Sequence, residues 1–291
     1  MNPEALGAAD GPADRLRRLV PSVVRADLRH RTGLTVPGDL AHRPSPPTPA
    51  PGEHTGPPDF ALLGDDDAGS RWWLSLVTDH PDVAPGHATD AAAQFFAPYC
   101  TQPFGPAEVA AFHAWFPRRP GRIVGYWSSE ALAQPWTVPL LARAAPRALL
   151  VFVVRDPVER LLDGLDRTVD ARPLHPGSYL SDAVERGFYA EQLGRLLAAF
   201  PTDQVRVLQY ERCVADPVGP LARTFEFLGV DPGHRSRPMD PPAPRTGRAA
   251  GCLDPATLAR LEELYAADVA ALGGLVPDLD LALWPNFAPG H

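Results

Sequence analysis

The chain has 291 residues, 36 of them prolines, and all 27 of its basic residues are arginines. Its formal net charge of −8 at pH 7 argues against a general nucleic-acid binder, which needs a basic face. No apolar run reaches the roughly 18 residues that span a bilayer, and the N-terminus does not resemble a signal peptide. We therefore expect a soluble, cytoplasmic protein, and the composition suggests a GC-rich bacterial genome.

The cysteines and histidines give no sign of a metal site. Cys100, Cys213 and Cys252 are odd in number and widely spaced, and the histidines show no ligand spacing. We expect free thiols in a reducing compartment and no bound metal.

Residues 1–56 differ in composition from the rest of the chain. Asp14 can cap a basic helical segment that Pro21 interrupts, and residues 36–58 are rich in Pro, Thr, Gly and Ala. We expect a basic arm and a Pro-rich linker, followed by one folded domain over residues 57–291. The arm packs on the acidic domain in one interpretation; in the other it docks to a partner or a membrane surface.

Strands and helices are predicted to alternate through the folded domain. The predicted strands cover residues 60–63, 122–127, 148–154 and 205–210. The predicted helices cover residues 72–78, 108–116, 134–144, 157–165, 179–199, 217–228 and 255–272. The continuous apolar run 148–154 is typical of a central parallel strand that is buried on both faces. The order predicts a three-layer, P-loop-like α/β fold in which helices flank a central parallel sheet.

One strand, loop and helix unit stands out at residues 58–74. Gly64 and Gly69 bound a short loop, a layout that turns backbone N–H groups and a helix N-terminus toward an anion. A phosphate-binding loop of this spacing normally carries a lysine, whereas this one carries Asp65, Asp66 and Asp67. The loop therefore has the shape of a phosphate site and the opposite charge.

The folded region resembles the PAPS-dependent sulfotransferase family, in particular its bacterial and heparan-type branches. The likeness covers roughly residues 57–284 and depends on short motifs in a fixed order: Pro58-Asp59-Phe60, His80-Pro81-Asp82-Val83, Val153–Arg160, Gly187–Leu193, Val207–Glu211 and Phe227–Val230. The resemblance implies transfer of a sulfuryl group from PAPS (3′-phosphoadenosine 5′-phosphosulfate) to a hydroxyl or amine. Such a site needs cations and N–H donors around the phosphosulfate and a general base for the acceptor.

The resemblance also implies which residues bind the nucleotide. They are the loop residues Gly69, Ser70 and Arg71, the 3′-phosphate arginine Arg155 with Asp163 beside it, and a late basic loop containing Arg245, Gly247 and Arg248. Four positions depart from the family pattern. Asp67 replaces the loop lysine and Asp163 replaces a serine, while Ala92 and Tyr126 stand where the family has carboxylates that act as the base.

Three functions remain open from the sequence, all set in small-molecule, natural-product biosynthesis. The first is ordinary PAPS-dependent transfer. In the second, arginines hold the sulfate of a sulfated amine while Asp65, Asp66 or Asp67 binds and deprotonates the ammonium, so that intramolecular displacement closes a ring such as an aziridine and releases sulfate. The third is a non-catalytic subunit that stabilises a protein partner. A partner protein or a second copy of the chain is compatible with each function.

Overall fold

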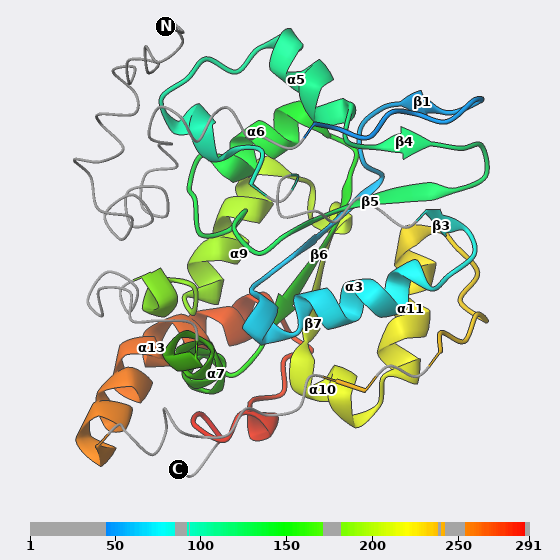
Figure 1. Ribbon diagram of the computed structural model, residues 1–291. Helices are drawn as coiled ribbons and strands as arrows, with labels where there is room; N and C mark the ends of the chain where they lie inside the picture. The colour runs from blue at the N-terminus through cyan, green and yellow to red at the C-terminus, as the bar shows by residue number, and fades with distance from the viewer. Residues whose placement is uncertain are drawn as a thin grey trace, which may run out of the picture.

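A five-stranded parallel sheet forms the centre of the computed structural model, which describes residues 45–84, 92, 94–170, 182–237, 240–241 and 254–288 (Figure 1). The strand order is β3-β5-β2-β6-β7. The strands are β2 (Phe60–Leu63), β3 (Val83–Ala84), β5 (Ile123–Ser128), β6 (Leu149–Val154) and β7 (Val205–Gln209). Because β2 pairs with β5 on one side and β6 on the other, all four of its residues are fully buried.

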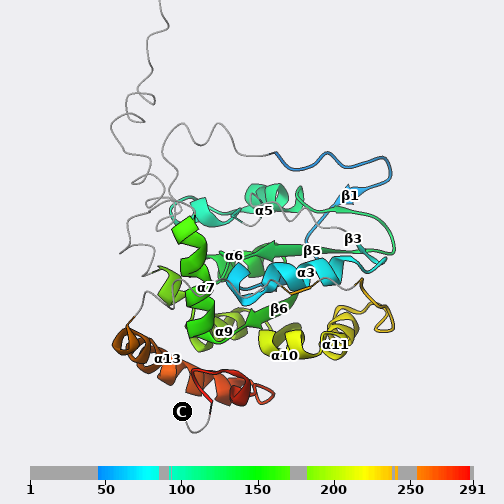
Figure 2. The same ribbon diagram turned by 60° about the horizontal axis from the view of Figure 1, so that its bottom comes forward.

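Helices cover both faces of this sheet, as the sequence predicted (Figures 1 and 2). Alternate residues of β2 point to opposite faces. Phe60 and Leu62 belong to one apolar cluster together with Trp72 and Trp73, whereas Ala61 belongs to the other. The first face carries α3 (Ser70–Thr78) and α11 (Val218–Leu228). The second carries α5 (Pro106–His113), α6 (Thr137–Ala144), α9 (Tyr189–Ala199) and α13 (Pro255–Leu275).

Two further helices follow directly after strands. Helix α7 (Pro157–Asp170) begins two residues after β6, and α10 (Tyr210–Ala215) continues from the last residue of β7. Short 3-10 helices occupy Asp66–Ala68, Ala97–Cys100, Thr202–Gln204 and Leu281–Leu283. Among the described residues, none of the helices is long and apolar enough to cross a membrane.

The predicted helix over residues 179–199 is wrong at its N-terminal end. Residues 182–185 form a separate helical turn, and α9 begins only at Tyr189. A Cβ on Gly187 would lie 2.6 Å from the ring of Tyr265, and Phe188 has the non-helical angles φ −82° and ψ 78°. The packing of α13 against this point therefore breaks the helix, and this turn positions Arg186 for the site.

Part of the segment predicted as a linker is paired with the folded domain. The short strand β1 (His54–Thr55) pairs antiparallel with β4 (Pro117–Arg118), and Arg118 also forms an ion pair with Asp59. The predicted basic arm lies almost wholly outside the described residues.

A segment after α13 crosses the carboxyl ends of β6 and β7. Asn286 donates its backbone N–H to Asp156 Oδ2 at 3.1 Å, and Trp284 Nε1 donates to Glu211 Oε2 at 2.9 Å. Gln209 and Asp280 exchange two hydrogen bonds of 2.8 and 3.0 Å. Residues 280–286 thereby fasten the end of the chain's described part to the edge of the sheet that carries the glycine loop.

Candidate functional site

The glycine loop lies at the carboxyl end of β2, the edge where open α/β sheets bind ligands. Both of its glycines are required by geometry. Gly64 has φ +128°, and a Cβ there would lie 2.7 Å from the carbonyl oxygen of Val153. Gly69 has φ +83°, and a Cβ there would lie 2.4 Å from the ring of Tyr210. The loop therefore packs closely against β6 and α10, and both positions require glycine because a Cβ would clash there.

Inside the loop, side chains satisfy the backbone. Asp65 Oδ1 accepts the N–H of Asp67 at 3.0 Å and caps the 3-10 turn Asp66–Ala68. Ser70 Oγ donates to the carbonyl of Gly64 at 2.8 Å and accepts Trp127 Nε1–H at 3.2 Å. Ser70, which the resemblance assigns to the cofactor, is fully buried and closes the loop on itself.

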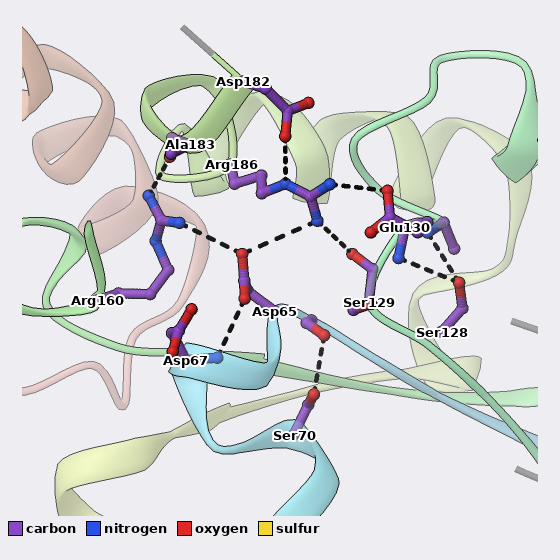
Figure 3. A network of polar contacts seen from close by, with 12 residues as sticks. Asp65, Asp67, Ser70, Ser128, Ser129, Glu130, Arg160, Asp182, Ala183 and Arg186 are labelled. Atoms are coloured by element: carbon purple, nitrogen blue, oxygen red, sulfur yellow. Dashed lines mark hydrogen bonds and ion pairs between the residues drawn. The ribbon is translucent and has the colours of Figure 1, made fainter. Parts of the chain in front are cut away.

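The other carboxylate oxygen of Asp65 faces two arginines (Figure 3). Asp65 Oδ2 lies 3.3 Å from Arg160 Nη1 and 3.9 Å from Arg186 Nη1. Arg160 projects from α7, its side chain is 1% exposed, and it also donates to the carbonyl of Ala183. Asp65 therefore joins the loop to two segments that are distant in sequence.

Arg186 is the most heavily paired group of the site. Its Nη2 donates to Glu130 Oε2 at 2.7 Å, its Nε to Asp182 Oδ2 at 2.9 Å and its Nη1 to the carbonyl of Ser129 at 3.0 Å. Burial by itself lowers the pKa of the Arg186 guanidinium, but the carboxylates of Glu130, Asp65 and Asp182 outweigh burial and the net shift is upward. Arg186 therefore stays charged and holds three acidic side chains in place.

A cavity of about 200 Å³ opens beside the loop. Five carboxylates line it, those of Asp65, Asp66, Asp67, Glu130 and Asp182, together with the guanidinium groups of Arg160 and Arg186. Five negative and two positive lining residues give a formal charge of −3, while Arg71 pairs with Asp66 from outside the lining. Taken over all of its lining, such a cavity favours a cation over an anion.

Arg155 lies at the end of β6, as the sequence predicted, but its guanidinium is already paired. Arg155 Nη1 donates to Asp163 Oδ2 and to the carbonyl oxygen of Asp67, each at 2.6 Å. The same guanidinium lies over the ring of Tyr210, 4.9 Å from its centroid. The structure thus brings together Arg155, Asp163 and Asp67, three residues that the sequence singled out.

The remaining predicted site residues lie in different surroundings. Arg71 pairs with Asp66 at 3.1 Å and stacks on Trp127 at 4.1 Å, and its side chain is 50% exposed. Ala92 and Tyr126 are buried in the core, and burial raises the pKa of Tyr126, so neither position supplies a base. Arg245, Gly247 and Arg248 lie outside the described residues.

Four residues of the site escaped sequence reasoning: Glu130, Arg160, Asp182 and Arg186. A signal existed for two of them, because Glu130 follows β5 and Arg160 follows β6 at the same edge of the sheet. For Asp182 and Arg186 the i,i+4 spacing in the predicted helix signalled their ion pair but not their place at this site. In the part of the chain that the structure describes, no cluster of His, Cys, Asp and Glu has the arrangement of a metal site.

A parallel sheet with a glycine loop after β2 and an arginine after the central strand defines a P-loop-like α/β protein. The chain belongs to the sulfotransferase family, whose sequence profile matches residues 70–233, more than half of the chain.

Curated relatives agree with this assignment. Mouse heparan sulfate glucosamine 3-O-sulfotransferase 3B1 is 28% identical over 199 residues, which cover 60% of this chain and 46% of that protein. Mouse heparan sulfate glucosamine 3-O-sulfotransferase 6 is 26% identical over 263 residues, covering 78% of this chain and 75% of that one. The chain spans about half the length of the 3B1 relative.

A solved structure supports the fold. The sulfotransferase from Alicyclobacillus acidocaldarius has a TM-score of 0.60 and 23% sequence identity, covering 78% of this chain and 98% of that one.

Family membership implies PAPS, and the described residues can be compared with what that nucleotide needs. Its phosphosulfate needs N–H donors and cations at the glycine loop, where the carboxylate of Asp65 already takes the N–H of Asp67 and faces Arg160. Its 3′-phosphate needs Arg155, which is paired with Asp163. Both places carry a carboxylate in contact with the groups that would hold the nucleotide. The described residues therefore do not fit PAPS.

Proposed function

We propose that this sulfotransferase-family protein is an enzyme of small-molecule biosynthesis that takes a sulfated amine and eliminates its sulfate, without PAPS. The observation that carries the proposal is the charge of the site. The cavity beside the glycine loop has a formal charge of −3, and the loop lysine that the family resemblance implies is replaced by Asp67. A substrate that enters this cavity is expected to bring a positive charge, and an ammonium group is the simplest such group.

Asp67 is the proposed base. It lines the cavity and occupies the position of the lysine that contacts the reacting group in the family pattern. Its backbone is fixed on both sides, because its N–H donates to Asp65 and its carbonyl oxygen accepts from Arg155. A carboxylate carried on a fixed backbone can accept a proton from a neighbouring ammonium group. Asp66, in the same loop, adds to the field that holds this ammonium group.

The reaction needs no external reactant. The ammonium loses a proton to Asp67, and the amine lone pair attacks the neighbouring carbon that bears the sulfate ester. A C–N bond forms, the C–O bond to sulfate breaks, and sulfate leaves with the bonding electron pair. A three-membered ring results when amine and sulfate sit on adjacent carbons, and the intramolecular geometry accelerates the displacement.

The sulfate end of the substrate is assigned to Arg245 and Arg248. This assignment comes from the sequence, because both arginines lie outside the described residues. A guanidinium fork matches two sulfate oxygens and stabilises the charge of the leaving group. The proposal thus divides the two ends of a zwitterionic substrate between an acidic cavity and a basic loop.

The test is release of inorganic sulfate from vicinal amino sulfates, beginning with 2-aminoethyl sulfate, in the absence of nucleotide. We expect release by the wild-type protein and a loss of at least about 100-fold in kcat for Asp67→Asn, which keeps the shape and removes the base. Asp66→Asn is the matched control, with a raised KM and a much smaller change in kcat.

Calorimetry with PAP (adenosine 3′,5′-bisphosphate, the nucleotide that remains when PAPS loses its sulfuryl group) distinguishes the alternatives. Micromolar PAP binding by the wild-type protein would favour ordinary sulfuryl transfer. If folded protein neither binds PAP nor releases sulfate from a panel of amino sulfates, the proposal fails and a non-catalytic, partner-stabilising role takes its place. Co-purification with a related subunit would then test that role.

A further inference from the structure

We propose that the carboxylate of Asp65 is an internal anion that fills the oxyanion position of the glycine loop. In this view the N–H of Asp67 and the guanidinium groups of Arg160 and Arg186 form an anion site, and the protein excludes sulfate and phosphate groups from it by occupying it with its own side chain. The inference does not depend on the sulfated amine being the substrate.

The contacts of Asp65 are those of a bound oxyanion. One carboxylate oxygen takes a loop N–H, that of Asp67, at 3.0 Å, and the other lies 3.3 Å from Arg160 Nη1 and 3.9 Å from Arg186 Nη1 (Figure 3). Backbone N–H groups of a glycine loop and guanidinium groups are the donors that proteins use for phosphate and sulfate. A tetrahedral anion placed between these donors would use two of its oxygens in the same way.

Burial explains why this position must hold a negative charge. Arg160 is 1% exposed on its side chain, and Asp65 is its ion-pair partner. A buried guanidinium without a counter-ion is strongly destabilising. If the Asp65 charge is removed, a small anion from solution becomes the natural replacement.

Asp66 provides a contrast within the same loop. Its carboxylate pairs with Arg71, whose side chain is 50% exposed. Neutralising Asp66 therefore removes the same formal charge from the loop while the pairing of Asp65 with Arg160 and Arg186 remains. Asp65→Asn and Asp66→Asn form a matched pair of variants.

Asparagine is the appropriate substitution at Asp65. Its side-chain oxygen can still accept the N–H of Asp67, so the cap of the 3-10 turn is kept while the charge is lost. Inorganic sulfate is the probe. Calorimetry reports its affinity, and thermal unfolding in sodium sulfate against sodium chloride of equal ionic strength reports the stabilisation. Sulfate stabilises most proteins by exclusion from their surface, so the comparison with wild type and Asp66→Asn is essential.

We expect Asp65→Asn to bind sulfate saturably, at least about tenfold more tightly than wild type and Asp66→Asn, in line with the strength of a charge-assisted hydrogen bond. Its melting temperature should rise more with sulfate than that of the other two proteins. Equal responses in all three proteins would overturn the inference. If Asp65→Asn does not fold in chloride, it is titrated with millimolar sulfate, too dilute for stabilisation by exclusion: refolding supports the inference, and failure to refold contradicts it. Sulfate release by the wild-type protein tests the proposed function separately, and its absence would leave this inference intact.

Discussion

Arg155 and Asp163 form an ion pair, with Arg155 Nη1 2.6 Å from Asp163 Oδ2 and side chains that are 11% and 18% exposed. The arginine stands at the end of β6 and the aspartate lies within α7. In the family pattern a serine occupies the aspartate's position, and both residues face a 3′-phosphate. In this protein the carboxylate of Asp163 pairs with the guanidinium that the family pattern assigns to the phosphate.

The first prediction follows from this pair. Asp163→Ser removes the competing carboxylate and should raise the affinity for adenosine 3′-phosphate by roughly tenfold or more, because a repulsion between close charges disappears. Calorimetry would measure the gain, with adenosine 5′-phosphate as the control ligand. An equal gain for both nucleotides would show that Arg155 does not face a 3′-phosphate.

A second prediction concerns the loop charge. Asp67→Lys places a cation where the family pattern has one and should raise PAP affinity by about 10- to 100-fold, the range expected for hydrogen bonds to charged groups. Asp66→Lys makes the same change of charge one residue earlier, where the side chain contacts the exposed Arg71. If both variants gain equally, net charge alone is responsible and the cradle geometry of the loop is not retained.

A third prediction concerns stability. Arg186→Gln removes the counter-ion of Glu130 and Asp182 and the more distant of the two arginines at Asp65, and we expect a loss of about 3–5 kcal/mol in the free energy of unfolding. Arg119→Gln is the comparison, because Arg119 pairs with Glu53 at the surface and such pairs contribute about 0–1 kcal/mol. Urea unfolding measures both. Similar losses would mean that the Arg186 network is no more stabilising than a surface pair.

A fourth prediction concerns cysteine reactivity. Burial raises the pKa of the Cys213 thiol from 9.0 to about 12, with a smaller contribution from Glu211, and the residue is 2% exposed. Little thiolate exists at pH 8, so Cys213 should resist alkylation in the native protein and react fully in denaturant. Mass spectrometry of labelled peptides would locate the modification. Rapid native labelling at Cys213 would contradict its place in the core.

Local signals in the sequence were sufficient for much of the fold. The predicted strand at β6 and the predicted Asp254 cap of α13 were confirmed. Both signals depend on residues that are adjacent in the sequence. The spacing of the two loop glycines also predicted a tight turn, and the structure confirms it. The break before α9 was missed because it depends on Tyr265, far along the chain, which packs against Gly187.

Only part of the site could be predicted from the sequence, again because the rest depends on contacts between residues that are distant along the chain. The acidic loop was visible as three consecutive aspartates, but the arginine that pairs with Asp65 is 95 residues away. Whether ion pairs neutralise the charges of these aspartates depends on which side chains the sheet brings to its carboxyl edge. Glu130 and Asp182 both contact Arg186 there: Asp182 stands at the i,i+4 helical spacing from Arg186, whereas Glu130 is 56 residues away and no spacing rule connects it to them.

The fastening of residues 280–286 to β6 and β7 has a consequence for biosynthesis of the chain. Asp156 and Glu211 receive hydrogen bonds from Asn286 and Trp284 across 130 and 73 residues of sequence. These partners emerge from the ribosome after the strands of the sheet, and contacts of such long sequence separation form slowly. A nascent chain that ends before Asp280 therefore carries the glycine loop without the segment that closes this edge of the sheet. This edge of the sheet is expected to be completed only after residues 280–286 have been synthesised, so chaperone contact during that interval should influence the yield of folded protein.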